Sequence, residues 1–232
     1  RTRSAPTYPT ADSALSNVTV VDYRQLGDSG LTVSAVGLGC NNFGGASSSE
    51  HVHAYGALGL EETRAVVEAA LDCGITFFDT SNVYGKGGSE RFLGEILRDR
   101  RHDVVIGTKW GSGERPDVAW GAGAHIRRCV EESLARLQTD YIDLYQMHWP
   151  DPRTPIEETL EVLTELVREG KIRYVGSSHL AAWEVIDADW IARTRGLERF
   201  VSAQNEYNLL RRGAEAELVP ACAKVGVGLL PY

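Results

Sequence analysis

Four side chains in this sequence could together carry out proton transfer. Asp79, Tyr84, Lys109 and His148 each stand at or just beyond the end of a short apolar run. They supply an acid, a phenol, an amine and an imidazole. Titratable side chains are rarely found near an apolar core unless they are paired with an opposite charge or take part in function. If the runs are neighbouring parallel strands, these side chains converge on one face and form an active site.

The combination suits the reduction of a carbonyl group. A phenol such as Tyr84 has a pKa of ~10 and is protonated at neutral pH. The ammonium of Lys109 would lower that pKa and make the phenol a better proton donor, while Asp79 would balance the ammonium charge. Such a donor can protonate an alkoxide as it forms, and His148 could orient the carbonyl oxygen. The alternatives are a structural ion pair between Asp79 and Lys109, and a core histidine at position 148.

The elements that must position these residues alternate in type along the chain. Short β-branched runs alternate with longer stretches whose apolar residues recur every three or four positions. Strands are expected at 33–39, 75–78, 104–108, 142–147, 172–176, 201–204 and 227–230, and helices at 60–71, 89–97, 124–137, 155–168, 181–191 and 213–225. Strict alternation predicts a parallel sheet, and its spacing favours an α/β fold of the (β/α)8 TIM barrel type.

An open, doubly wound sheet is the alternative architecture. It usually carries a glycine-rich phosphate loop after its first strand, and the turn at 37–42 lacks the third glycine of that loop. We divide the chain into a flexible leader at 1–21 and one barrel domain at 22–232. No eighth strand follows the seventh, so the C-terminal portion of the barrel is expected to be absent from this sequence.

Composition narrows the classes of partner. The formal net charge of the 232 residues is −8, which disfavours binding to nucleic acid or to anionic membranes. No apolar stretch reaches the ~18 residues that span a bilayer. Four well-separated cysteines without a CxxC pair predict reduced thiols in a cytoplasmic protein. His51 and His53 have no evident third ligand, so no metal site is expected.

Six segments resemble the aldo-keto reductase family in order and spacing. They are 78–85 (FDTSNVYG), 106–109 (IGTK), 145–148 (YQMH), 170–178 (GKIRYVGSS), 204–208 (QNEYN) and 230–232 (LPY). The resemblance covers roughly 22–232 and implies the same barrel. It implies NADPH-dependent reduction of a small aldehyde or ketone to the alcohol by hydride transfer. In that reaction Tyr84 is the general acid, Lys109 and Asp79 tune it, and His148 orients the substrate.

The resemblance also predicts contacts with the cofactor. Ser178 and Gln204 match positions that hydrogen-bond the nicotinamide carboxamide, and Tyr232 matches the aromatic residue that stacks on the ring. Gly39 and Asn41, at the end of the first predicted strand, could approach the cofactor backbone. Stacking and carboxamide bonds would leave one face of the ring open for hydride transfer.

One position departs from the family pattern. His179 stands where the family usually has asparagine. Its imidazole can also donate a hydrogen bond to a carboxamide oxygen. The alternative is that His179 supports the residues that contact the cofactor without contacting it itself. Trp110 and Trp149 adjoin Lys109 and His148, and are therefore expected to line an apolar substrate pocket. Packing within loops is the alternative for both tryptophans.

Two other functions fit part of the pattern. A non-catalytic relative that binds NADPH could act as a sensor or as an auxiliary subunit of a membrane channel. A lyase or isomerase could use Lys109 to form a Schiff base. In the family, most contacts to the 2′-phosphate of the cofactor follow the seventh strand, so the preference for NADPH over NADH rests on the resemblance. The motifs specify neither the substrate nor the oligomeric state.

Overall fold

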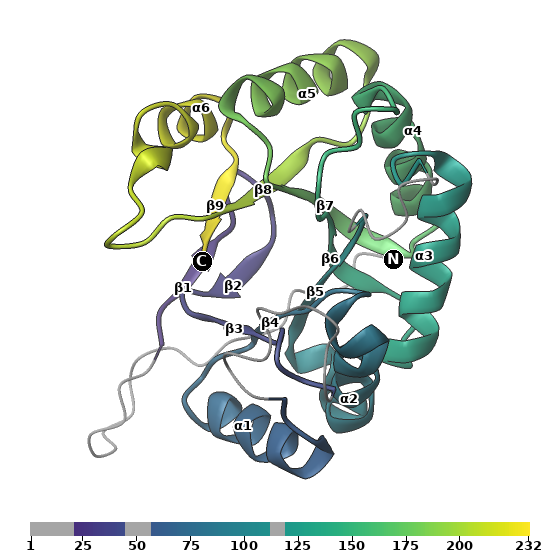
Figure 1. Cartoon of the computed structure of the whole chain (residues 1–232), viewed down its shortest axis with the longest axis vertical. Helices are drawn as coiled ribbons and strands as arrows, with labels where there is room; N and C mark the ends of the chain where they lie inside the picture. Colours follow the sequence, from purple (N-terminus) through teal and green to yellow (C-terminus); the bar gives the residue numbers. More distant parts are fainter. Residues whose placement is uncertain (1–20, 45–56, 112–118) are drawn as a thin grey trace.

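A parallel sheet curls into an open barrel with helices on its outer face (Figure 1). The computed structural model describes residues 21–44, 57–111 and 119–232. Within these ranges the barrel strands are β3 (Gly37–Gly39), β4 (Phe77–Asp79), β5 (Val105–Trp110), β6 (Ile142–Met147), β7 (Ile172–Ser178), β8 (Phe200–Asn205) and β9 (Gly228–Pro231). Each strand pairs with the next one along the chain, in the order β3-β4-β5-β6-β7-β8-β9. The predicted barrel topology is therefore confirmed, with seven of its strands described here.

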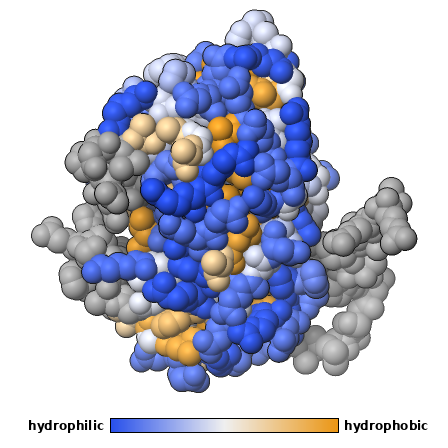
Figure 2. All heavy atoms as spheres, turned by 90° about the vertical axis from the view of Figure 1, so that its right-hand side faces the viewer, coloured by the Kyte–Doolittle hydropathy of each residue, from blue (hydrophilic) through white to orange (hydrophobic). Residues whose placement is uncertain are grey.

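The helices cover the sheet because each has one apolar face. They are α1 (Leu60–Asp72), α2 (Gly88–Ile96), α3 (Gly123–Leu137), α4 (Ile156–Arg168), α5 (Ala182–Arg195) and α6 (Leu218–Val225), with short 3₁₀ segments at η2 (Tyr84–Gly87), η3 (Arg98–Asp103) and η4 (Gly213–Glu215). In α4, for example, Leu160, Leu163 and Leu166 are fully buried at helical spacing. The surface around α3 and α4 is mostly hydrophilic, with small hydrophobic patches (Figure 2).

The first predicted strand, 33–39, is in fact two strands. β2 (Thr32–Ser34) pairs antiparallel with β1 (Tyr23–Gln25), and β3 begins only at Gly37. The turn between them is held by the Ser34 hydroxyl. It donates a hydrogen bond to the carbonyl of Val36 and accepts hydrogen bonds from the backbone N–H groups of residues 76 and 77. The hairpin was not predicted, since strands of three residues leave almost no periodic signal.

The hairpin closes the end of the barrel at which the strands begin. Leu26, Leu31 and Val33 pack there against Phe77, Val105 and Leu144 in one buried cluster. Burying this end leaves the opposite end, where the strands finish, for polar side chains. Most of the other predicted elements agree with the structure to within about three residues, although the last predicted helix begins as η4 and becomes α-helical only at Leu218.

Several sequence expectations fall partly or wholly outside the described ranges. The leader at 1–21 does so except for its last residue, and so do His51 and His53. The described helices include none long and apolar enough to cross a membrane. All four cysteines are free thiols, and Cys73 is the exposed one.

Candidate active site

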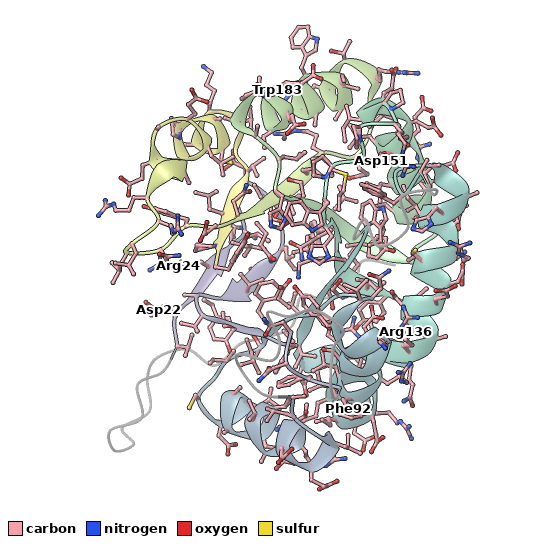
Figure 3. The ribbon with its side chains drawn as sticks, in the orientation of Figure 1. Asp22, Arg24, Phe92, Arg136, Asp151 and Trp183 are labelled. Carbon is pink, nitrogen blue, oxygen red and sulfur yellow. The ribbon has the colours of Figure 1, made fainter. Side chains whose placement is uncertain are left out.

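Side chains from neighbouring strands point into the interior of the curled sheet (Figure 3). Asp79 ends β4, and Lys109 stands on β5 two residues beyond the register partner of Asp79. Lys109 faces the barrel interior with its side chain fully buried. Tyr84 lies in the loop after β4, where Gly85 has a φ of +56°. A Cβ on Gly85 would lie 2.7 Å from the carbonyl oxygen of Phe43, so glycine lets this loop pack closely enough to present Tyr84.

Asp79 and Lys109 form a close ion pair. The ammonium Nζ donates to Oδ2 of Asp79 at 2.5 Å and to the carbonyl oxygen of Thr80 at 2.9 Å. Burial by itself lowers the pKa of Lys109, but the charge of Asp79 and the bond to Tyr84 outweigh burial and raise it. Lys109 is therefore a charged ammonium at neutral pH.

Tyr84 lies directly beside this ammonium. The distance from Nζ of Lys109 to the centre of the Tyr84 ring is 5.1 Å. Burial raises the pKa of the Tyr84 phenol, and the charge of Lys109 with its hydrogen bond lowers that pKa by less. Lys109 thus acts in the expected direction, but the net pKa lies above its ordinary value. The phenol is a protonated donor with a cation placed to stabilise the phenolate.

His148 completes the cluster from the loop after β6. Its ring meets the ring of Tyr84 edge-on, with centroids 5.9 Å apart and planes at 86°. Burial lowers the pKa of His148 to about 3, and the charges of Lys109 and His179 add to the effect. A neutral imidazole carries one N–H. Because Nδ1 lies 3.3 Å from the Ser81 hydroxyl, a bond donated by that hydroxyl would leave Nε2–H free for a substrate oxygen.

The predicted nicotinamide contacts gather at the neighbouring strand ends. Ser178 and Gln204 are register partners on β7 and β8, and the Ser178 hydroxyl donates to the Gln204 carbonyl at 2.8 Å. No described residue bonds the side-chain amide of Gln204, so it is free to pair with a planar amide. A nicotinamide carboxamide is a group of that kind, so Gln204 fits it, whereas the buried Ser178 hydroxyl already contacts the Gln204 carbonyl and Nδ1 of His179.

Gly39 and Tyr232 border an open cavity that runs between the edge strands β3 and β9 and reaches Asp79. The cavity has a volume of about 620 Å³, and its lining includes Gly39, Asp79, Gln204 and Tyr232. Nothing lies within 4 Å of where a Cβ of Gly39 would stand, so a ligand can pass over this position. Asn41 lies in an exposed turn beyond Gly39 and does not line this cavity.

His179 connects the two halves of the site. Its ring stacks on Trp149 with centroids 3.6 Å apart and planes at 9°. Nδ1 lies 2.8 Å from the carbonyl oxygen of His148, and Nε2 lies 2.8 Å from the Tyr232 hydroxyl. A carbonyl only accepts, so Nδ1 carries the proton and Nε2 accepts from Tyr232. Burial lowers the pKa of His179, which favours this neutral form.

The two tryptophans lie on opposite sides of the barrel wall. Trp149 is 44% exposed at the mouth, as a pocket residue should be. Trp110 is fully buried outside the sheet, where it stacks on Tyr145 at 4.7 Å and donates to the carbonyl of Trp120. Successive residues of a strand face opposite sides, so Trp110 must point outward when Lys109 points inward. The structure therefore does not bring Trp110 to the site, contrary to the expectation from sequence.

Two polar residues of this site were not singled out from the sequence. Ser81 contacts His148, and Gln146 donates from Nε2 to Oδ1 of Asp79 at 2.9 Å. Gln146 is fully buried within the run 142–147. A glutamine on the same face of this buried strand as Leu144, two residues before His148, was the signal that could have identified it. The whole arrangement places a protonated phenol beside a cation and a neutral imidazole, next to a carboxylate that lines an open cavity.

Comparison with known proteins gives one consistent result. The Aldo/keto reductase family matches residues 35–232 of this chain. Probable aldo-keto reductase 1 of Glycine max is 37% identical over 212 residues, which cover 90% of this chain and 58% of that protein. An uncharacterized oxidoreductase of Bacillus subtilis is 38% identical over 227 residues (91% and 66%). Versiconal hemiacetal acetate reductase of Aspergillus parasiticus is 37% identical over 234 residues (91% and 66%).

A solved structure agrees in fold. A thermostable aldo-keto reductase, crystallised with the inhibitor epalrestat, superposes with a TM-score of 0.77 at 34% identity, covering 90% of this chain and 72% of the other. The chain spans about three-fifths of the length of the curated relatives it matches. The matching family, the relatives and the shared fold lead to one conclusion: the chain belongs to the aldo-keto reductase family.

Proposed function

We propose that this protein reduces a small aldehyde or ketone to the alcohol, with NADPH as the hydride donor and Tyr84 as the general acid. The observation that carries the proposal is the buried Asp79–Lys109 pair beside a protonated phenol and a neutral His148. When bound, NADPH would supply the hydride. The protein's own contribution is to hold the carbonyl and deliver the proton.

Each polar group then has one task. The raised pKa keeps Tyr84 protonated until negative charge develops on the substrate oxygen. Lys109 stabilises the phenolate left behind, and Asp79 holds Lys109 in place. His148 donates one N–H to the same oxygen and fixes the direction of the carbonyl. Trp149, exposed beside it, forms one wall of the substrate pocket.

The nicotinamide would be held by residues from three strands. Ser178 and Gln204 would bind its carboxamide, Tyr232 would stack on its ring, and Gly39 and Asn41 would border the path of the cofactor. The open volume beside Gly39 and the unpaired amide of Gln204 support this assignment. Preference for NADPH over NADH is part of the proposal. So is a cytoplasmic location, which the four free thiols support.

His179 is proposed to contact the cofactor only by giving up an existing bond. Both of its ring nitrogens already have partners: Nδ1 contacts the His148 carbonyl and the Ser178 hydroxyl, and Nε2 contacts the Tyr232 hydroxyl. A carboxamide group could therefore bind this imidazole only if it replaced the Tyr232 hydroxyl at Nε2.

The Schiff-base alternative is disfavoured by charge. A lysine that attacks a carbonyl must be a neutral amine, and the pKa of Lys109 is raised by Asp79 and Tyr84 against the effect of burial. The NADPH-binding sensor is tested directly by turnover. Tight cofactor binding without reduction of any simple carbonyl would favour it.

The test is Tyr84→Phe, assayed with a panel of aromatic, aliphatic and sugar aldehydes against NADPH and NADH. Loss of the proton donor should lower kcat by about 10²- to 10⁴-fold. NADPH affinity, measured by fluorescence titration, should change little. Tyr23→Phe is the matched control, because that phenol bonds Gly74 at the hairpin end. Unchanged turnover in Tyr84→Phe would show that another group is the acid.

A further inference from the structure

We propose that Gln146 is a positioning residue that fixes the carboxylate of Asp79 and, through it, the Lys109–Tyr84 pair. This inference rests on the proposed function of Tyr84. Gln146 does not line the cavity that Asp79 borders, and the hydrogen bond of its side chain in the described structure is to Asp79, so it acts through that carboxylate.

The two oxygens of Asp79 are held by two different strands. Gln146, on β6, is the register partner of Lys109 on β5, so both side chains enter the barrel interior at the same level. Nε2 of Gln146 donates to Oδ1 at 2.9 Å, and Nζ of Lys109 donates to Oδ2 at 2.5 Å. A carboxylate held at one oxygen can turn about its Cβ–Cγ bond. Held at both oxygens, it presents a fixed acceptor to Lys109.

The barrel makes room for this glutamine. A Cβ on Gly176, its register partner on β7, would lie 3.0 Å from Cγ of Gln146 and 2.3 Å from the hydroxyl of Ser202. Any larger residue at position 176 would therefore displace one of these side chains. The space beside Gln146 depends on a glycine.

Stability does not explain a glutamine at this position. The side chain is completely buried, and its Oε1 has no hydrogen-bond partner in the described structure. A buried polar atom without a partner is costly. Leu144 lies two residues earlier on the same face of β6 and belongs to an apolar cluster, so an apolar residue suits this interior. A group kept at a cost to stability points to a functional role.

Loss of Gln146 should loosen the pair without breaking it. The side chain of Asp79 is 17% exposed, so an unanchored carboxylate can turn toward the cavity that it borders. Lys109 would then be aligned less well with Tyr84. Because the charge of Asp79 raises the pKa of Lys109, a misaligned carboxylate should let that ammonium titrate at lower pH.

The experiment compares Gln146→Met with its neighbour Tyr145→Phe. Methionine matches the length of glutamine without its amide. The Tyr145 hydroxyl is also buried and unpartnered, but it lies on the outer face of β6. Three quantities are measured in the wild type and both variants: thermal unfolding, kcat and KM, and the ¹⁵N titration of the Lys109 ammonium. The chain has four lysines, so the Lys109 signal can be assigned from its loss in Lys109→Met.

We expect Gln146→Met to keep or raise the unfolding temperature. It should lower kcat about tenfold and leave KM for NADPH unchanged. The Lys109 ammonium of this variant should lose its proton at a lower pH than in the wild type. Tyr145→Phe should keep both kcat and the Lys109 titration. A Gln146→Met variant with wild-type kcat and titration overturns the inference. So does one that loses activity only in proportion to lost stability. If the wild type reduces no carbonyl, the proposed function fails, and the Lys109 titration still decides the role of Gln146.

Discussion

The two ends of this barrel carry the same kinds of chemical group in different arrangements. The upper cluster, where the strands end, consists of Asp79, Tyr84 and Lys109. The lower cluster, where the strands begin, consists of Arg101, Tyr141, Asp143 and Arg173. Each combines a carboxylate, a cation and a phenol, and each carboxylate belongs to a strand. What differs is how completely the polar groups satisfy one another.

The lower cluster is fully bonded by rigid groups. Asp143 accepts from Arg101 at 2.7 Å, from Arg173 at 2.9 Å and from the backbone N–H of Ile106 at 3.0 Å. The two guanidinium groups lie 4.0 and 3.6 Å from the centre of the Tyr141 ring, so this ring is also occupied. Planar arginine groups suit such fixed, multiple contacts.

The upper cluster uses a lysine and borders a cavity. Lys109 is a compact ammonium with rotatable donors, and Asp79, its carboxylate partner, lines the cavity. Barrel enzymes carry their chemistry at the end where the strands finish, and their stability at the other end. The comparison teaches that the same three chemical groups serve either purpose, depending on which donors and acceptors are left free.

The largest expected effect is that of Lys109→Met on catalysis. Without the cation the phenolate of Tyr84 loses its stabilisation, so kcat should fall by about 10³-fold. Unfolding free energy should fall less than in the lower cluster, because Asp79 keeps Gln146 and can reach solvent through the cavity. Steady-state kinetics and urea unfolding measure the two effects.

Lys109→Arg separates charge from shape at the same position. It keeps the positive charge, but a planar fork cannot replace the compact ammonium between Asp79, Thr80 and Tyr84. We expect nearly the same loss of kcat as in Lys109→Met. A fully active arginine variant would mean that charge alone suffices, and that the two ends of the barrel differ less than the comparison implies.

The next largest effect is that of Asp143→Asn on stability. The substitution leaves the guanidinium of Arg101, only 7% exposed, without its charged partner. Breaking a buried pair in this way costs about 3 kcal/mol of unfolding free energy. Because the lower cluster lies at the far end of the strands, kcat at a temperature where the variant is folded should equal that of the wild type. A variant that is stable but slow would contradict this division of roles.

A third test uses pH to measure how completely His148, at the upper end of the barrel, is shielded from solvent. Burial holds the pKa of His148 at about 3, against ~6.5 in the unfolded chain. Above about pH 6.5 His148 is neutral in both the folded and the unfolded chain. As the pH falls from 6.5 toward 3, only the unfolded chain binds a proton at His148, so the free energy of unfolding decreases. Between about pH 7.5 and 4.5 the loss should be on the order of 2–3 kcal/mol.

The control for the pH test is His148→Asn, measured by urea unfolding at both pH values. This variant should lose less stability on acidification than the wild type does. Equal losses would mean that His148 is well solvated and titrates normally. Because His148 stays neutral, the pH profile of kcat in the wild type should have no inflection near pH 6.5 that is absent from the profile of His148→Asn.

Much of the upper cluster could be predicted because its members follow buried strands directly. Asp79, Lys109 and His148 are polar residues at the ends of apolar runs, and parallel strands bring such ends together. The barrel could be predicted for the same reason, from local periodicity repeated along the chain. Tyr84 lies in the loop after β4, where its phenol and its position close behind Asp79 indicated a proton donor, and the family resemblance then implied its role as the general acid.

The remaining features depend on register and depth, which no local pattern contains. The bond between Gln146 and Asp79 joins residues 67 positions apart across an intervening strand. Trp110 is adjacent to Lys109 in sequence but faces the opposite side of the wall. The net shift of the Tyr84 pKa could not be predicted without knowing how deeply the phenol is buried, because burial raises this pKa by more than the neighbouring cation lowers it. Each of these is a property of packing in three dimensions.

The smallest expected effect belongs to Arg173→Lys in the lower cluster. The Arg173 side chain is 45% exposed, and Asp143 keeps Arg101 when Arg173 is replaced. The loss of unfolding free energy should therefore be about 0.5–1 kcal/mol, with kcat unchanged. Arg101→Lys is the matched comparison, because Arg101 is buried and also donates to the carbonyls of Val104 and Tyr141. It should cost clearly more, since a lysine cannot make all of these contacts. Equal costs would show that the lower cluster depends on net charge rather than on the fixed geometry of its arginines, and the contrast with the upper cluster would then reduce to access to the cavity.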